Sequence, residues 1–243
     1  MIEVQAVSIV YRSGDEAVPA VDGVSFRVGE GEMVAVVGPS GCGKSSLLLA
    51  IDGLLRPTSG RVLIAGEEVQ GVRRDVALIL QDAGLLPWKT VRQNAELTLH
   101  IQKRRESADG ILSALGLRGF EGRFPAELSE GMRRRVGIAR ALALRPRVLL
   151  MDEPMANLDS ITRERIQNLI LDLWWEMRFT GILVTHDIEE AVFLGQRIVV
   201  LSPRPARVRE ILENPGTGTP DYRGSPEFLA QAKALRRILE GNR

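Results

Sequence analysis

The sequence predicts an α/β protein built on a doubly wound parallel sheet, and three observations carry that prediction. Short apolar runs rich in Val, Ile and Leu recur without polar alternation, which is typical of strands buried on both faces of a parallel sheet. Helical stretches separate these runs. A glycine-rich turn joins the first run to the helix that follows it. The runs lie at 33–37, 76–80, 148–151, 182–185 and 198–201.

Two regions interrupt this alternation of strands and helices. Residues 2–28 predict two antiparallel strands, 3–11 and 21–28, joined by the turn-like stretch 12–20. The middle of the chain, about 89–145, is helical without a strand-like run. We therefore expect a helical lobe inserted into the sheet-forming part of the chain.

Helices are expected after three of the five strands, and the chain is expected to close with one more strand and one more helix. A loop rich in Pro and Gly separates these last two elements. The expected helices lie at 44–51, 161–178, 188–195 and 227–240, and the last strand lies at 207–212.

Composition narrows the class of protein. A chain of 243 residues fits one large domain or one domain with an inserted lobe. Its net charge of +1 gives no broad basic surface, so nucleic acid is not an expected partner. The single cysteine, Cys42, excludes an internal disulfide and fits a reducing cytosol. No targeting signal is evident, and no apolar run approaches the ~18 residues that span a bilayer, so work at a membrane would require another chain.

The stretch GPSGCGKSS has the spacing of a phosphate-binding loop. It matches G-x-x-x-x-G-K-[ST] and lies between an expected strand and an expected helix, the context that the motif requires. Glycines let the backbone wrap a phosphate, and amide groups at the helix N-terminus face the anion. Lys44 would reach the outer phosphates and Ser45 would ligate Mg²⁺, whereas Cys42 is interpreted as a small filler residue. The loop consists of Gly38, Pro39, Ser40, Gly41, Cys42, Gly43, Lys44, Ser45 and Ser46.

Three further side chains at strand ends suit phosphoryl chemistry. Asp152 and Glu153 end an apolar strand, where the first suits Mg²⁺ and the second could orient or deprotonate the attacking water. His186 ends another strand and could reach the γ-phosphate or that water. The alternatives are an acidic turn before Pro154 and a capping histidine. The other histidine, His100, is interpreted as structural or solvent-facing.

Six motifs occur in a fixed order: GPSGCGKSS, LILQD, LSEGMRRR, VLLMDEP, ANLD and VTHD. This order resembles the ATP-binding subunit of ABC transporters over essentially residues 2–205. The resemblance implies a P-loop NTPase (RecA-like) core with an N-terminal antiparallel β subdomain and an inserted helical signature subdomain. It implies an ATPase domain over 1–212, followed by a C-terminal loop and helix (213–243) packed on the core. ATP and Mg²⁺ are the implied ligands.

The resemblance also implies roles for single residues. Tyr11 would stack on adenine, although a strand aromatic packed in the sheet is the alternative. Gln81 would contact Mg²⁺ and water and couple the two lobes. Asp159 would organise the interface between two ATPase subunits, and His186 would be the switch histidine. With Lys44 and Glu153, Gln81 and His186 complete the implied catalytic set.

The segment LSEGMRRR would form the signature loop, which in this family caps the ATP held by the other subunit. Ser129 suits a helix N-cap, and Gly131 permits close backbone approach. An apolar helical stripe is expected at Met132, Val136, Ala139 and Ala143. The arginines would lie largely on other faces, as a solvated helical face from which one or two arginines steady the loop. A basic patch for nucleic acid is the rejected alternative.

Two residues depart from the family's usual signature segment. Glu130 replaces a glycine, and Arg134 replaces a glutamine. A carboxylate close to a triphosphate is repulsive in principle. We expect Glu130 to turn to solvent or to Arg133 or Arg134.

One copy of each motif implies that two subunits pair head to tail, as a homodimer with two composite sites. The absent membrane span implies that the permease subunits are separate chains. They would contact this chain near residues 85–88. The alternative is that these residues pack locally within the lobe. Several segments resemble the nitrate, sulfonate, taurine and aliphatic-amine importer group. This implies an anion importer on the cytoplasmic face of the inner membrane, served indirectly by an extracytoplasmic solute-binding protein. An exporter or lipid-transport ATPase, a non-transport ABC ATPase and a P-loop kinase are the alternatives.

Overall fold

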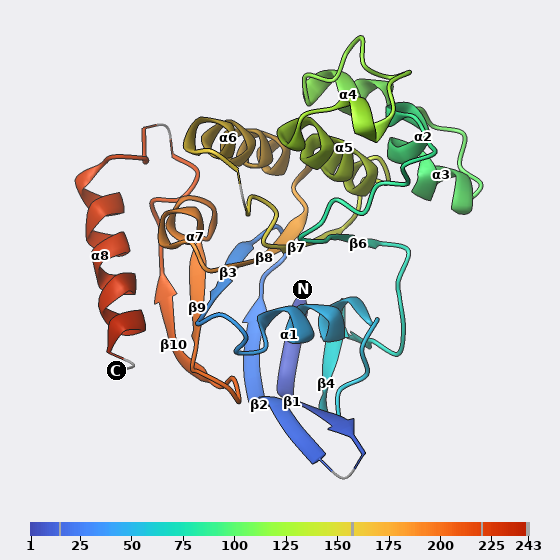
Figure 1. The fold of residues 1–243 in the computed structure, drawn as a ribbon. Helices are drawn as coiled ribbons and strands as arrows, with labels where there is room; N and C mark the ends of the chain where they lie inside the picture. Colours follow the sequence, from blue (N-terminus) through green and yellow to red (C-terminus); the bar gives the residue numbers. More distant parts are fainter. Residues whose placement is uncertain (15, 157, 220, 242–243) are drawn as a thin grey trace. The chain divides into compact units, whose positions relative to one another are not determined.

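A computed structural model describes residues 1–14, 16–156, 158–219 and 221–241 (Figure 1). The chain divides into two compact units, each considered by itself. The first unit comprises Met1–Arg73 and Phe179–Arg243, and the second comprises Arg74–Arg178. Among the residues that the structure describes, no helix is long and apolar enough to cross a bilayer.

An antiparallel sheet with strand order β2-β1-β4-β5 begins the first unit (Figure 1). Its first hairpin is longer than the sequence predicts, because residues 12–20 are mostly strand rather than a turn-like stretch. Gly14, at φ 59°, adopts the left-handed conformation that a tight turn requires, so the two strands continue almost to the turn. The prediction also missed the second hairpin, formed by β4 and β5. The strands are β1 (Ile2–Ser13), β2 (Glu16–Val28), β4 (Ser59–Ile64) and β5 (Glu67–Glu68).

Strands in the order β10-β9-β3-β8 form the second layer of this unit. β3 pairs in parallel with β8 and β9, and β10 pairs with β9 in the antiparallel sense. Every residue of β3 and β8 is buried, which explains the apolar runs at 33–37 and 182–184 and confirms the predicted parallel core. The strands are β3 (Met33–Val37), β8 (Thr180–Thr185), β9 (Arg197–Leu201) and β10 (Val208–Glu213).

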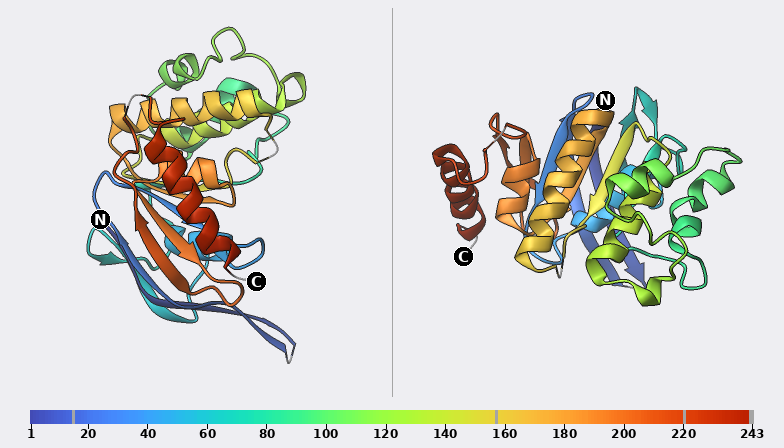
Figure 2. Two further views of the ribbon diagram at one scale, coloured as in Figure 1. Left: turned by 90° about the vertical axis from the view of Figure 1, so that its left-hand side faces the viewer. Right: turned by 90° about the horizontal axis from the view of Figure 1, so that it is seen from above.

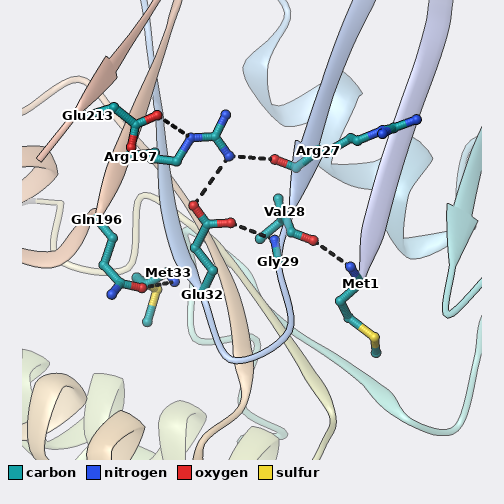
Figure 3. Close-up of polar contacts among 9 residues, drawn as sticks. All are labelled: Met1, Arg27, Val28, Gly29, Glu32, Met33, Gln196, Arg197 and Glu213. Atoms are coloured by element: carbon teal, nitrogen blue, oxygen red, sulfur yellow. Dashed lines mark hydrogen bonds and ion pairs between the residues drawn. The ribbon is translucent and has the colours of Figure 1, made fainter. Parts of the chain in front are cut away.

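The side chain of Arg197 forms polar contacts with residues at the ends of several strands (Figure 3). Its Nη1 donates to the main-chain oxygen of Arg27 at 3.0 Å and lies 3.3 Å from Glu32 Oε1, and its Nε donates to Glu213 at 3.1 Å. The N-terminal amine donates to the oxygen of Val28 at 2.7 Å. These contacts fix the turn between β2 and β3 against the start of β9 and the end of β10.

Among its described residues, the first unit also contains three helices. α1 lies beside the antiparallel sheet, and α8 packs on the outer side of α7 (Figures 1 and 2). Asn214, fully buried, links β10 to α7 because its Nδ2 donates to the oxygens of Val192 and Gly195, each at 2.7 Å. The helices are α1 (Lys44–Asp52), α7 (Ile188–Leu194) and α8 (Pro226–Glu240).

The described part of the second unit contains two parallel strands and the helical lobe. β6 pairs with β7, with Ile79 opposite Met151. Thr90 caps the first helix of the lobe through a reciprocal pair of hydrogen bonds with Gln93. Buried Asn94 holds the preceding loop through hydrogen bonds to Leu86, Lys89 and Thr90. The elements are β6 (Val76–Ile79), α2 (Val91–Ala95), α3 (Leu97–Ile101), α4 (Asp109–Ala114), the 3₁₀ turn η1 (Pro125–Glu127), α5 (Glu130–Leu142), β7 (Val148–Asp152) and α6 (Ser160–Met177).

Candidate nucleotide site and signature loop

The candidate site residues fall in both units. The first unit holds Tyr11, His186 and the phosphate loop of Gly38, Pro39, Ser40, Gly41, Cys42, Gly43, Lys44, Ser45 and Ser46. The second unit holds Gln81, Ser129, Gly131, Asp152, Glu153 and Asp159.

The phosphate loop connects β3 to α1, and at Gly43, immediately before the helix, its backbone has a conformation that only glycine can adopt. Gly43 has φ 122°, and a Cβ atom there would lie 2.6 Å from the main-chain oxygen of Ala20. A hydrogen bond from the Cys42 amide to the Pro39 oxygen, 3.2 Å long, closes the loop on itself. The loop therefore curls tightly before α1 begins, with the helix N-terminus at its end.

Lys44 extends along the inside of this loop. Its Nζ donates to the main-chain oxygens of Gly38, at 2.9 Å, and Pro39, at 3.0 Å. The residue is only 5% exposed, so its charge is held at the loop rather than in solvent. An ammonium group has three donors, which leaves one for an anion.

Cys42 is buried in the loop and packs like a small apolar residue. Burial raises the pKa of its thiol, and the nearby charge of Lys44 opposes this only in part. The protonated thiol is a poor nucleophile. This favours the interpretation of Cys42 as a filler residue.

Tyr11 is brought to the first turn of α1. Its hydroxyl lies 2.9 Å from Ser46 Oγ, so the sheet and the phosphate loop meet here. The side chain remains 43% exposed, which speaks against the alternative of an aromatic packed inside the sheet. An exposed ring beside the loop is available for stacking.

His186 is exposed directly after β8, in a turn fixed by its neighbours. The Asp187 amide donates to Thr185 Oγ1 at 3.0 Å, and Asp187 Oδ1 accepts from the amides of Glu189 and Glu190. Thr185 also donates to Glu190. Because Asp187 caps α7, the backbone that carries His186 is held in place. The other histidine, His100, is exposed on α3.

Gln81, Asp152 and Glu153 lie at the carboxyl ends of two neighbouring strands in the second unit. Glu153 has φ 45°, a left-handed conformation that costs a non-glycine residue about 1 kcal/mol or more. Asp152 is buried and Gln81 is exposed. Strained backbone at a strand end is typical of functional positions.

The signature loop forms the N-terminus of α5 as the sequence predicts. Ser129 is the N-cap, and its hydroxyl accepts a hydrogen bond from the Met132 amide at 3.3 Å. Gly131 is buried, and a Cβ atom there would lie 2.8 Å from Thr162 Cγ2. Thr162 was missed at the sequence level, although it lies three residues after Asp159 in a helix-capping pattern.

The structure corrects the expected solvated face of α5, because all three arginines of the signature segment, rather than one or two of them, hold the surrounding loops. None of Arg133, Arg134 and Arg135 is exposed. They donate to the main-chain oxygens of Leu128, Ala156 and Leu115, at 3.2, 3.3 and 3.0 Å respectively. These arginines therefore bind the loops around the signature segment. Guanidinium groups that are buried or half-buried and that donate to carbonyl groups do not form a nucleic-acid surface.

Glu130 and Asp159 are exposed carboxylates near this loop. Glu130 Oε1 lies 4.0 Å from Arg134 Nη2, and its side chain is 50% exposed. Asp159 caps α6 by accepting from the Thr162 amide at 3.0 Å. That hydrogen bond lowers the pKa of Asp159. Residue 157 of the ANLD motif lies outside the described residues.

The expected permease-facing segment keeps an exposed tryptophan. Trp88 is 70% exposed, whereas Leu85 and Leu86 are half-buried. This loop is held by the hydrogen bonds of Asn94 and not by burial of Trp88. Local packing therefore accounts for the two leucines but not for the tryptophan.

Comparison with known proteins agrees with these features. The sequence matches the ABC transporter family over residues 21–156. The chain belongs to this family. It is 39% identical to the nitrate import ATP-binding protein NrtD of a Synechocystis species, over 99% of this chain and 95% of that protein. It is 43% identical to the taurine import ATP-binding protein TauB of Yersinia pestis, over 88% of each.

A solved structure of an ABC family member shares the fold. It is a dimeric ATP-binding cassette in a post-hydrolysis state, bound to ADP and phosphate. The TM-score is 0.78 at 34% identity, over 88% of this chain and 98% of that one. The expected P-loop core with an antiparallel β subdomain is thereby confirmed for this ABC protein.

Proposed function

We propose that this chain is the ATP-binding and ATP-hydrolysing subunit that powers solute import through a separate membrane permease. The phosphate loop around Lys44 is the observation that carries the proposal, because its backbone and charge are arranged for an anion. The names of the nitrate and taurine relatives support an import system for small inorganic or organic anions.

The first unit would bind the nucleotide. The amides of the phosphate loop and the α1 N-terminus would face the phosphates, and the remaining donor of Lys44 would stabilise the negative charge that develops during hydrolysis. Tyr11 would stack on the adenine ring, since its ring is exposed while its hydroxyl group is anchored on Ser46.

Mg²⁺ fits the oxygen groups of the site. Among the described residues, no three His, Cys, Asp or Glu side chains gather into a metal site. Magnesium in nucleotide sites is held largely by phosphates and water, with only one or two protein oxygens. Ser45, Gln81 and buried Asp152 would supply those oxygens, and the bound ion would neutralise phosphate charge.

Glu153 and His186 would prepare the attacking water. Glu153, which follows the buried end of β7 on a strained backbone, would orient the water or accept its proton. His186 would hold the γ-phosphate or the same water, because the capped turn before α7 fixes its backbone.

A second ATPase subunit would complete each site. Ser129, Gly131 and the α5 N-terminus would cap the nucleotide bound by the partner, and Asp159 would organise the contact between subunits. Two copies of this chain paired head to tail would form two such sites. The dimeric state of the similar solved cassette supports this arrangement.

The permease would contact the helical lobe near exposed Trp88, since burial of a tryptophan is a common interface anchor. This contact would hold the chain on the cytoplasmic face of the inner membrane. A solute-binding protein on the other side would choose the solute and would reach this subunit only through the permease.

ATP-dependent pairing provides the decisive test. Glu153→Gln is expected to bind ATP, to hydrolyse it at least about 100-fold more slowly, and to form a dimer that sizing and light scattering detect. Lys44→Ala should neither hydrolyse ATP nor dimerise, and Lys233→Ala on exposed α8 is the matched control. A Glu153→Gln protein that keeps parental hydrolysis would contradict the assignment.

Affinity capture from detergent-solubilised host membranes tests the transport role separately. Recovery of a multi-span permease with the tagged chain is expected. The Trp88→Ala variant should recover less of it, with unchanged ATPase activity in the isolated chain. Capture of only soluble partners would leave the ATPase chemistry standing and overturn the import role.

A further inference from the structure

A cavity of about 390 Å³ lies within the second unit, between the end of α4, α5 and α6. Its apolar wall includes Leu115, Ile166 and Leu169. Two arginines, Arg135 and Arg165, line the same space. None of the residues proposed above to bind or hydrolyse ATP lines this cavity.

The two arginines leave the cavity with excess positive charge. Arg135 is half-buried and donates hydrogen bonds to the main-chain oxygens of Leu115, at 3.0 Å, and Gly131, at 3.4 Å. Within the described part of the chain, neither Arg135 nor Arg165 forms an ion pair with a carboxylate, although Asp172 also lines the cavity. Burial, and then the neighbouring charge of Arg165, lower the pKa of Arg135.

We propose that this cavity binds a small organic anion with a short apolar chain. Its sulfonate or carboxylate head would lie between Arg135 and Arg165, and its chain would cover Leu115 and Leu169. Guanidinium groups suit such heads because they offer paired donors in one plane. An anion here would also relieve the repulsion between the two arginines.

The cavity borders directly on the signature loop. Arg135 donates to the oxygen of Gly131, and Thr162, another wall residue, packs against the backbone of Gly131. An anion that attracts Arg135 would weaken its 3.4 Å contact with Gly131 and loosen the loop. ATP hydrolysis would then be slower. The proposed regulation of hydrolysis rests on the proposed function of the signature loop, whereas the proposed binding of the anion does not.

Binding is tested by calorimetry on the full chain without nucleotide, in chloride-free buffer. The probe is 1-butanesulfonate, compared with sulfate, which lacks the chain, and with 1-butanol, which lacks the charge. Butanesulfonate should bind more tightly than sulfate, and butanol should not bind. Arg165→Gln should weaken butanesulfonate binding at least about fivefold. Asp172→Asn should tighten it, because the variant removes a like charge from the cavity.

Arg236→Gln supplies the matched control, since it makes the same change of charge on exposed α8 in the other unit. It should leave the affinity unchanged. The site is overturned if butanesulfonate does not bind at about 10 mM, or if Arg165→Gln and Arg236→Gln weaken binding equally.

ATPase assays then test regulation. Saturating butanesulfonate should slow hydrolysis by the parent several-fold and should affect Arg165→Gln only at correspondingly higher concentration. Binding without any change in hydrolysis would overturn the regulatory part alone. A parent with no ATPase activity would instead count against the proposed function, and calorimetry would still decide the binding site.

Discussion

Arg134 joins the signature helix to the carbonyl of Ala156. Its Nη2 donates to the main-chain oxygen of Ala156 at 3.3 Å and lies 4.0 Å from Glu130. The residue is 6% exposed, and its Nη1 has no hydrogen-bond partner among the described residues. A buried guanidinium with an unused donor is costly, so the nearby carboxylate of Glu130 offsets part of that cost. The two departures from the usual signature segment thus occur as a pair.

This pairing predicts the effect of restoring glycine at position 130. ATP hydrolysis by Glu130→Gly should stay within about tenfold of the parent, because the exposed carboxylate is drawn toward Arg134. Glu130→Gln, which keeps the size of the side chain, is the control for backbone effects of glycine. Steady-state hydrolysis at saturating ATP is the measurement. A gain above tenfold in Glu130→Gly would mean that the carboxylate opposes the nucleotide.

Gly43 gives a sharper prediction, because its backbone conformation excludes a side chain. In Gly43→Ala the new methyl group would meet the Ala20 oxygen at 2.6 Å with φ at 122°. We expect the free energy of unfolding to fall by about 1–3 kcal/mol and ATP binding to be lost. Urea unfolding and titration with a fluorescent ATP analogue measure the two effects.

Gly110→Ala is the matched control for this loop variant. Gly110 lies in α4, where a Cβ atom would meet nothing within 4 Å apart from its chain neighbours and the backbone of its own helix. This variant should be more stable by about 0.5–1 kcal/mol, because alanine is a better helix former. If Gly43→Ala binds nucleotide as Gly110→Ala does, the loop geometry does not carry the binding.

The buried strands could be predicted from sequence because both faces of each strand are apolar. β3 and β8 are buried at every position, so their composition alone identifies them. β4 begins with three exposed residues, Ser59, Gly60 and Arg61, and therefore lacks such a run. The stretch 12–20 contains Gly and Pro and predicts a turn. Cross-strand pairing, such as Val10 with Pro19, overrides that local preference.

Motif spacing predicted which residues form the candidate site, but not what surrounds them. The Ser129 cap and the Lys44 loop follow from local chain geometry, which a short motif specifies. The burial of Arg134 depends on Ala156, and the tight packing of Gly131 depends on Thr162. Contacts between distant segments leave no periodic trace in the sequence, so the sequence predicts that only one or two arginines of α5 support the loop and that the others lie in solvent.

Asp52 makes the stability of the protein depend on pH. The residue ends α1 and is 4% exposed, and burial raises its pKa from 3.8 to about 6. Because the folded pKa lies above the unfolded pKa, folding takes up a proton between about pH 4 and 6. Asp52 therefore costs no stability at low pH and destabilises the fold progressively as pH rises through 6.

Asp52→Asn should remove this cost. At pH 8 the variant is expected to gain about 1–3 kcal/mol in free energy of unfolding, and near pH 4 it should match the parent. Urea unfolding across the pH range provides the measurement. Asp172→Asn on the exposed face of α6 should change little at either pH. Equal stability of Asp52→Asn and the parent at pH 8 would contradict the burial argument.

Asn214 connects the C-terminal segment to the rest of its unit through buried hydrogen bonds, which water cannot reach. Its Nδ2 reaches Val192, Gly195 and Thr217, and its Oδ1 accepts from the hydroxyl of Tyr222. Tyr222→Phe would leave that oxygen buried without its donor, which should cost about 1–3 kcal/mol. Asn214→Ala should cost more, because it removes one donor from each of two main-chain oxygens, and the single hydroxyl hydrogen of Thr217 cannot serve both.

Both changes should also release α8 from α7 before the whole protein unfolds. Trypsin should then cleave after Arg223 or Arg236 faster than in the parent, in proportion to the lost stability. Thr219→Ala is the control, because the side chain of Thr219 is exposed and its hydroxyl donates to the nearby Gly216 oxygen, and it should change stability by less than about 0.5 kcal/mol. If Asn214→Ala and Thr219→Ala were cleaved at the same rate, the tail would be held by the apolar contacts of Phe228 and Leu235 rather than by Asn214.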